Sequence, residues 1–429
     1  MDRRVYAATL LSCTIGLALQ AQPIVPDGTT STAVQPGNVI VPTNTDSIRG
    51  TNLFHSFDRF DVPLGGVTFG TGDTGINGAR ITNIFNRVTG TTPSTIFGTI
   101  QTSQSFPLAN FYLLNPNGVV FGSDAKLDVG GTFVASTATA IGFSGGGIFT
   151  TDRSRAFFPG GSPLNLQFSV TQPAAIVNQG QLEVKTGQDI VLAGGTVVSP
   201  RTLTAPAGNV DVVAVAGNST VTLRSPTAIL GLEIRPGSLA PQWQGTITDL
   251  PQLAQLLTGA SATLEAQELA VNPDGSLELL PRGKAAGLST LLLANGKFEP
   301  IGEMAIKPGD VILGSIAATD IQAIADNNLG IFVPNLQARG SLLLQGQNNL
   351  VLRDTLSTPA IVASGSNLTL RGDQGVDILA LNNPNNPITS GGNITFRSDG
   401  KILADGFLPQ RARSGLGASA ITSAASSVP

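Results

Sequence analysis

The sequence has few charged residues and only one cysteine, and these shortages exclude several classes of protein. Lys, Arg, Asp and Glu make up 12% of the 429 residues, against about 25% in an average globular protein. The net charge is −4, and without a basic cluster interleaved with aromatic residues we expect no binding to nucleic acid. Cys13 lies in the N-terminal segment, so the chain beyond it has neither disulfides nor a thiolate nucleophile nor cysteine metal ligands.

Histidine is equally scarce, because His55 is the only one. This excludes metal sites built from several histidines and makes any Ser-His-Asp arrangement depend on one residue. Phe54, Phe57 and Phe60 surround it in the sequence, so we expect a packed or hydrogen-bonded structural histidine. We also find no EF-hand loop, calcium-binding nonapeptide repeat or P-loop, and therefore predict neither cofactor nor metal.

Glycine and short apolar runs are abundant instead. The chain has 51 glycines, well above the usual roughly 7%, and runs of β-branched residues alternate with Pro, Gly, Asn and Asp. This pattern predicts an all-β fold of short strands and frequent turns. The expected strands before residue 140 lie near 67–70, 79–85, 95–101, 110–114, 118–122 and 131–137, and residues 141–165 read as a loop or excursion.

The first residues have the pattern of a Sec export signal. Arg3 and Arg4 provide the positive start, and an apolar stretch too short to span a bilayer comfortably follows. Small residues allow cleavage after Ala18 or Ala21. One alternative is a buried N-terminal helix. Another is a lipoprotein signal at Cys13, but only about six apolar residues precede Cys13, fewer than a lipoprotein signal normally has.

From residue 340 the chain repeats itself. Gly340, Gly365 and Gly391 each open a unit made of a short strand, a polar turn and a second strand. A period of about 25 residues without helix indicates a β-helix, in which each repeat is one coil stacked on the last. A meandering β-sandwich with accidental similarity is the alternative.

The tetrapeptide Asn115-Pro116-Asn117-Gly118 stands between two apolar runs, NFYLL and VVFG. Pro and Gly favour a tight turn here, and we expect a positive φ at Asn117 and strain for any side chain at Gly118. The turn could close a hairpin or form a corner between layers. Because the flanking runs are apolar at consecutive positions, both faces are expected to be covered, and we predict a corner.

Three stretches resemble the haemagglutination-activity domain, the filamentous haemagglutinin N-terminal domain of two-partner secretion exoproteins. They are NLFHSFDRFDV at 52–62, NIFNRVTGTTPSTIFGTI at 83–100, and NFYLLNPNGVVFGSDAKLDVGGTFVAST at 110–137. The NPNG element is the hallmark of that family, and the LFHSF opening resembles its cyanobacterial branch. A second family motif, NPNL, is replaced here by TTPST.

The resemblance implies a right-handed parallel β-helix with an N-terminal cap and extra-helical strands. It also implies a secretion signal that an outer-membrane TpsB-type transporter with POTRA domains recognises in the periplasm. On that basis the expected organisation is a signal peptide at 1–21, a secretion-domain core at 22–140, further coils at 141–232, an irregular insertion with a short helix at 233–310, repeats at 311–405 and a disordered tail at 406–429.

Two functions follow from these expectations. The first is a secreted or surface-exposed exoprotein without enzymatic activity, acting in adhesion or aggregation through glycans or receptors of host or neighbouring cells. The second is a carbohydrate-active β-helix enzyme, for which Asp124 and Asp128 are the candidate carboxylates, although we prefer to explain both by turn chemistry. A passenger fused to its own barrel is a third reading, which the absence of C-terminal amphipathic strands disfavours.

The candidate recognition residues are the NPNG turn together with Asn83 and Arg87. Arg80 and Arg87 could each pair with a carboxylate or face solvent, and their sequence context does not decide which. Asparagines at corners are expected to bond the coil above, satisfying groups that the bend leaves unpaired.

Overall fold

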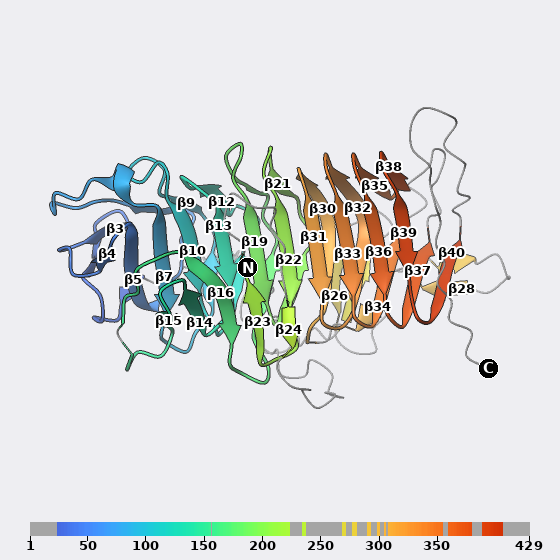
Figure 1. Cartoon of the computed structure of the whole chain (residues 1–429), viewed down its shortest axis with the longest axis horizontal. Coiled ribbons are helices and arrows are strands. Elements are labelled where there is room, and N and C mark those ends of the chain that lie inside the picture. Colours follow the sequence, from blue (N-terminus) through green and yellow to red (C-terminus); the bar gives the residue numbers. More distant parts are fainter. Residues whose placement is uncertain are drawn as a thin grey trace, which may run out of the picture.

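The computed structural model describes residues 24–155, 157–223, 308–354, 359–379 and 388–405, together with the backbone of six short strands between residues 234 and 305. These parts form one elongated stack of strands that runs from the N-terminal coils at one end to β40 at the other (Figure 1). The only helical element in the described parts is the short 3₁₀ helix η1 (Gly78–Arg80). None of the described residues forms a helix long and apolar enough to cross a membrane.

Three sheets make up the walls of the stack. The first sheet contains β1 (Val25–Pro26), β4 (Ile48–Arg49), β5 (Asn52–Arg59), β7 (Asn83–Val88), β10 (Asn110–Leu114), β13 (Phe133–Ser136), β19 (Ile190–Gly194), β22 (Val210–Ala214), β31 (Ile321–Ala325), β33 (Leu342–Gly346), β36 (Leu368–Gly372) and β39 (Ile394–Arg397). The second sheet contains β8 (Ser94–Ile96), β11 (Val119–Phe121), β17 (Ala175–Asn178), β18 (Leu182–Glu183), β20 (Thr196–Ser199), β21 (Leu203–Ala205), β30 (Val311–Ala318), β32 (Leu329–Ala338), β34 (Asn349–Arg353), β35 (Ile361–Ser364), β37 (Gly375–Leu379), β38 (Ile388–Ser390) and β40 (Lys401–Asp405). The third sheet contains β2 (Thr32–Gln35), β3 (Val39–Pro42), β6 (Val67–Phe69), β9 (Thr99–Gln101) and β12 (Lys126–Asp128).

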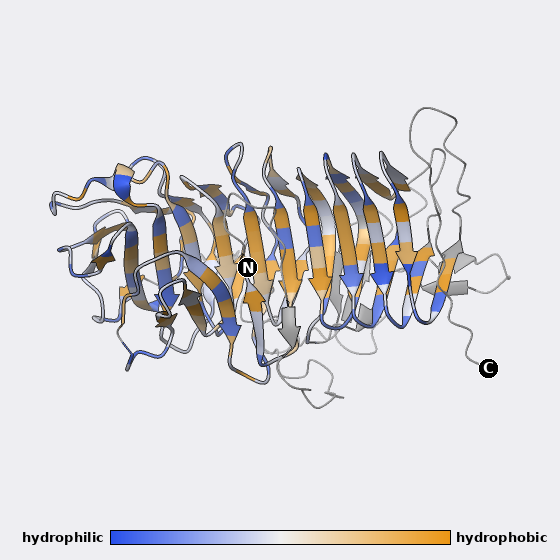
Figure 2. Ribbon diagram, in the orientation of Figure 1, coloured by the Kyte–Doolittle hydropathy of each residue, from blue (hydrophilic) through white to orange (hydrophobic). Residues whose placement is uncertain are grey.

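Neighbouring coils pair in parallel, which confirms the predicted β-helix. Leu342 pairs with Leu368, and Leu368 pairs with Ile394, 26 residues further along each time. Alternate side chains of these strands enter one continuous apolar core, and Figure 2 shows the resulting hydrophobic bands crossing the stacked strands. Each coil thus buries its apolar face against the coil before and after it.

The coils continue across the stretch at 224–307. β22 pairs directly with β31, and β20 pairs with β30, so the helix resumes in register after that stretch. The backbone strands inside it pair antiparallel: β25 (Glu268–Val271) with β26 (Leu277–Leu280) and β29 (Met304–Ala305), and β27 (Thr290–Leu292) with β28 (Phe298–Pro300). The short helix expected within 233–310, at residues 250–257 (LPQLAQLL), lies outside the described residues, as do the signal at 1–21 and the tail at 406–429.

A side sheet covers the first sheet near its N-terminal end. It consists of β14 (Ala140–Phe143), β15 (Ile148–Thr150), β16 (Pro163–Phe168), β23 (Ser219–Thr222) and β24 (Ile234–Pro236), all paired antiparallel. The segment 141–165, which we expected to be a loop or excursion, therefore contains strands of the side sheet. Within the region 141–232, where further coils were expected, the described coil strands are those from β17 to β22. A second apolar cluster fills the space between the side sheet and the first sheet.

Two expected strands are placed differently. The run at 95–101 is split between β8 in the second sheet and β9 in the third. The chain turns at Gly98, where a Cβ atom would lie 2.1 Å from the carbonyl oxygen of Pro63. The run at 79–85 begins in η1, and its strand starts only at Asn83.

Candidate functional site

The NPNG tetrapeptide is a corner, as predicted. It follows β10 of the first sheet and precedes β11 of the second sheet, and these two strands pair with different neighbours. β10 is covered on both faces, because Phe111 and Leu113 enter the helix core while Tyr112 and Leu114 join the cluster under the side sheet. The consecutive apolar residues on which the prediction rested are therefore explained.

Asn115 holds this corner on the preceding coil. Its amide nitrogen donates to the Thr92 carbonyl and to the Ser94 hydroxyl, both at 3.0 Å, and its Oδ1 accepts the Asn117 backbone N–H at 2.9 Å. Asn117 donates in turn to the Gly90 carbonyl at 2.8 Å. The NPNG corner thus stacks on the TTPST segment, one coil earlier.

Exposure divides the motif into an inner and an outer part. Asn115 and Gly118 are buried, whereas Pro116 and Asn117 are half-exposed. Gly118 has a φ of +118°, and a Cβ atom there would lie 3.3 Å from the Ala175 carbonyl, as expected. The expectation for Asn117 is wrong, because positive φ values among the described non-glycine residues occur at Asn38 and Ala207. Hydrogen bonds to the side chain of Asn115 hold Asn117 in place without a positive φ.

Asn83 lies inside a ladder of asparagines that crosses three coils. The Asn83 amide donates to Asn52 Oδ1 at 2.9 Å, and the Asn110 amide donates to Asn83 Oδ1 at 3.0 Å. The prediction that asparagines bond between coils is confirmed here. Asn83 is 8% exposed, so its side chain serves the stack and is closed to a partner that meets the folded domain.

Arg87 is fully buried, and its sequence context gave no sign of this. Its Nε donates to the Ser56 hydroxyl at 2.7 Å, and one terminal nitrogen donates to the Thr29 hydroxyl at 2.9 Å. The other donates to the carbonyls of Thr150 and Arg155. Burial lowers the pKa of the Arg87 guanidinium, while the carboxylates of Asp27 and Asp152 oppose that change.

His55 is a structural histidine, as expected. It is fully buried, its Nδ1 lies 2.8 Å from the Thr32 hydroxyl, and its ring meets Phe69 edge-on at 5.5 Å. Burial lowers the pKa of His55 to about 3, so the imidazole is neutral at physiological pH. Its Nε2 has no hydrogen-bond partner in the described structure.

The carboxylates considered for catalysis do not form a pair. Asp124 is exposed and accepts a bond from the neighbouring Ser123 hydroxyl at 3.1 Å. Asp128 instead accepts bonds from Ser103 at 2.5 Å and Gln101 at 2.9 Å. Across the described ranges no group of three or more His, Cys, Asp or Glu side chains could hold a metal ion.

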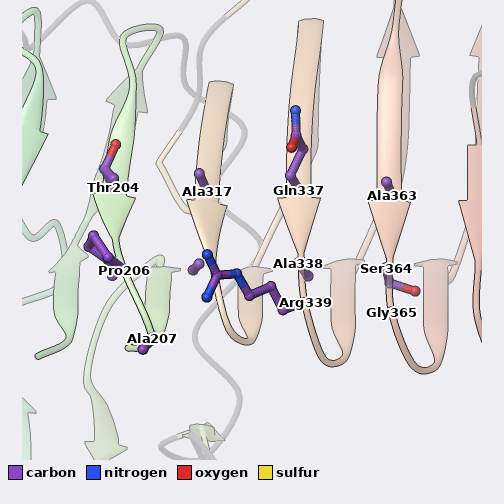
Figure 3. Close-up of a pocket in the computed structure, with 12 residues that line it drawn as sticks. Thr204, Pro206, Ala207, Ala317, Gln337, Ala338, Arg339, Ala363, Ser364 and Gly365 are labelled. Carbon is purple, nitrogen blue, oxygen red and sulfur yellow. The ribbon is translucent and has the colours of Figure 1, made fainter. Parts of the chain in front are cut away.

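A shallow groove of about 440 Å³ runs across four coils of the second sheet. Its floor is made mainly of alanines and other small side chains, and Arg339 is the one ionisable residue among its 12 lining residues. Figure 3 shows the Arg339 side chain extending along the groove toward the coil of Ala317. Without a carboxylate in the lining, this groove offers no acid and base pair for glycoside chemistry.

Asp211 is a buried group that sequence reasoning missed. It faces outward from β22, is 3% exposed, and its Oδ2 has no hydrogen-bond partner in the described structure. Burial raises the pKa of Asp211 to about 8, and the nearby carboxylates of Asp189 and Asp320 add to the shift. The signal was the single charge in the apolar run VDVVAVA.

The model of the TPS secretion domain family matches residues 22–255. Among solved structures, the chain is similar to the filamentous hemagglutinin secretion domain, with 16% identity, a TM-score of 0.39, and coverage of 90% of this chain and 98% of that chain. It is also similar to the HMW1 secretion domain from Haemophilus influenzae, with 16% identity, a TM-score of 0.33, and coverage of 90% and 84%. No curated protein matches the sequence.

The match to the family model covers more than half of the chain. Proteins with this domain are secreted, in general through an outer-membrane transporter of the TpsB type. The β-helix, its extra-helical sheet and the NPNG corner are consistent with that assignment. The chain therefore belongs to the TPS secretion domain family and is a two-partner secretion exoprotein.

Proposed function

We propose that the N-terminal part of the chain presents the export signal to the POTRA domains of an outer-membrane partner. The match of residues 22–255 to the secretion domain family is the observation that carries this proposal. Residues 1–21 would act earlier as a Sec signal peptide, because they combine a positive start with a short apolar stretch. The product would then reach the cell surface or the medium.

Within that signal we assign different roles to the candidate residues. The half-exposed Pro116 and Asn117 would contact the partner directly, at a corner that Asn115 and Gly118 hold from within. Asn83 and Arg87 are buried, so the partner would read them only before the chain folds. In the folded domain they would act by positioning the coils.

The coils at 311–405 would act in adhesion or aggregation, through glycans or receptors on host or neighbouring cells, and without enzymatic activity. Their stacked faces provide a long, regular surface. The groove around Arg339 has no carboxylate among its lining residues. No observation favours a second function over this one.

The decisive experiment is co-expression with the candidate POTRA-barrel partner, measuring the chain in the culture medium. We expect secretion only when both the partner and residues 1–21 are present. Replacing Cys13 with Ser should leave processing intact, because the lipoprotein reading is disfavoured. Equal amounts in the medium with and without the partner would exclude the proposed route.

The role of the motif is tested by replacing Asn115 and Asn117 with Ala together. Asn178→Ala is a matched control outside the motif, since this buried amide also binds a neighbouring hydroxyl, Ser199, at 3.1 Å. Each variant is compared for secretion yield and for the urea midpoint of the purified chain. At about 1 kcal/mol per lost bond, the motif variant should lose more stability than Asn178→Ala, because it removes more hydrogen bonds. Its loss of secretion should be much larger than that difference in stability explains. Normal secretion of the motif variant would show that recognition does not use NPNG.

A further inference from the structure

Arg87 joins three segments that are far apart in the sequence. Its donors reach Thr29 near the N-terminus, Ser56 in the first coil, and the carbonyls of Thr150 and Arg155 in the side sheet and the turn after it. The guanidinium carbon also lies 5.0 Å from the centre of the Phe149 ring. All of these acceptors are hydroxyls or carbonyls, so the cation depends on this whole set of neutral partners for its solvation.

The nearest counter-charge is built into the same network. Asp27 is 4% exposed, and its carboxylate accepts bonds from the Ser56 hydroxyl at 2.6 Å and the Thr89 hydroxyl at 2.7 Å. Ser56 is therefore shared between Arg87 and Asp27. In addition, Arg153 donates to the backbone carbonyl of Asp27, which joins the N-terminal segment directly to the turn after β15.

A second set of contacts holds the same part of the chain. The Asn52 amide donates to the carbonyls of Pro159 at 3.3 Å and Gly161 at 2.8 Å. The Phe54 ring packs against Phe149 at 4.8 Å in a tilted arrangement and stacks on Phe158 at 5.4 Å. We call residues 148–155 and 157–161 the strap. They run over the first coils and contact both the N-terminal segment at Asp27 and strand β5 at Asn52.

We propose that the strap closes the N-terminal end of the helix, and that Arg87 is the positioning residue that couples the strap to residues 24–35. When the strap leaves, the Arg87 cation loses two carbonyls and the Phe149 ring, and the network around Asp27 loses Arg153. The strap and the N-terminal segment therefore open together, as one unit separate from the later coils. The bearing of this coupling on export rests on the proposed function. A chain that emerges N-terminus first cannot close its first coils until residue 161 has emerged as well.

The coupling is tested by hydrogen exchange on the purified folded chain, read by mass spectrometry in low concentrations of urea. In the unmodified protein, peptides from 25–35 and from the strap should show the same opening free energy and the same urea dependence, distinct from the coils at 321–346. Different opening free energies for the two regions would overturn the proposal, whatever the outcome of any secretion assay.

Arg87→Met should raise exchange at least tenfold in both regions and leave 321–346 unchanged, whereas the matched control Arg80→Met should change neither, because Arg80 is exposed. Phe149→Leu is a milder variant that acts from the strap side, and it keeps the test open if Arg87→Met does not fold. It should also raise exchange at 25–35. A rise confined to the strap, or spread equally over all coils, would contradict the coupling.

Discussion

The buried imidazole of His55 makes stability depend on acidity. Its pKa is about 3 in the folded chain and about 6.5 when unfolded, so protonation favours the unfolded state. The contribution of His55 is fully present above pH 6.5 and is lost as the pH falls toward 3, by about 1.4 kcal/mol for each pH unit.

Urea midpoints at pH 7.5 and pH 5 measure this effect. Because Asp211 changes stability in the opposite sense over this range, the two chains are compared with each other. His55→Gln should be more stable relative to the unmodified chain at pH 5 than at pH 7.5, whatever its absolute stability. Because the chain has no other histidine, an unchanged pH dependence in His55→Gln would show that the folded imidazole can be protonated without penalty.

Asp211 has the opposite dependence. The pKa of Asp211 is about 8 in the folded chain and about 3.9 in the unfolded chain. As the pH rises, Asp211 therefore ionises in the unfolded state at a lower pH than in the folded state. Stability is therefore lost as the pH rises from about 4 to 8. Asp211→Asn should be more stable than the unmodified chain at pH 8, by about 1 kcal/mol or more, and should show less difference near pH 5.

Asp124→Asn is the control for that measurement, because Asp124 is an exposed carboxylate on the same chain. It should leave the urea midpoint nearly unchanged at both pH values. If Asp211→Asn were no more stable at pH 8 than at pH 5, relative to the unmodified chain, Asp211 would be ionised within the fold at little cost.

At the scale of single elements, corners depend on particular glycines. Gly118 combines a φ of +118° with a carbonyl 3.3 Å from the position of a Cβ atom, whereas Gly146 has a φ of +78° and open space. Both Ala replacements introduce strain, roughly 1–3 kcal/mol, and only Gly118→Ala adds crowding. Thermal melting should rank Gly118→Ala as the less stable variant by about 1 kcal/mol, and equal melting temperatures would show that Ala175 moves aside.

The sequence predicted those elements that local chemistry determines. The NPNG corner followed from Pro116, Gly118 and the apolar residues on both sides. The split at Gly98 was missed because Phe97-Gly98 continues an apolar pattern. The close approach of the Pro63 carbonyl, which leaves no room for a side chain at position 98, comes from a neighbouring loop. The burial of Arg87 was equally hidden, since its partners lie as far away as Thr29 and Arg155 and meet only in three dimensions.

For the whole molecule, a solenoid of short strands predicts a far-ultraviolet circular dichroism spectrum dominated by strand. Strands of all three walls of the stack pair in parallel from coil to coil. The measurement covers the full chain, and a helix content above about a fifth would be incompatible with a strand-rich solenoid.

The 26-residue step between Leu342, Leu368 and Ile394 has a mechanical consequence. A stretch of that length extends over roughly 90 Å when pulled straight, yet one coil adds only about 4.8 Å to the length of the folded helix. Each coil of this length that forms therefore takes up some 80 Å of contour length. If the chain folds on one side of a pore, each new coil therefore pulls more chain through to that side. Movement back through the pore would require a force large enough to unfold a whole coil.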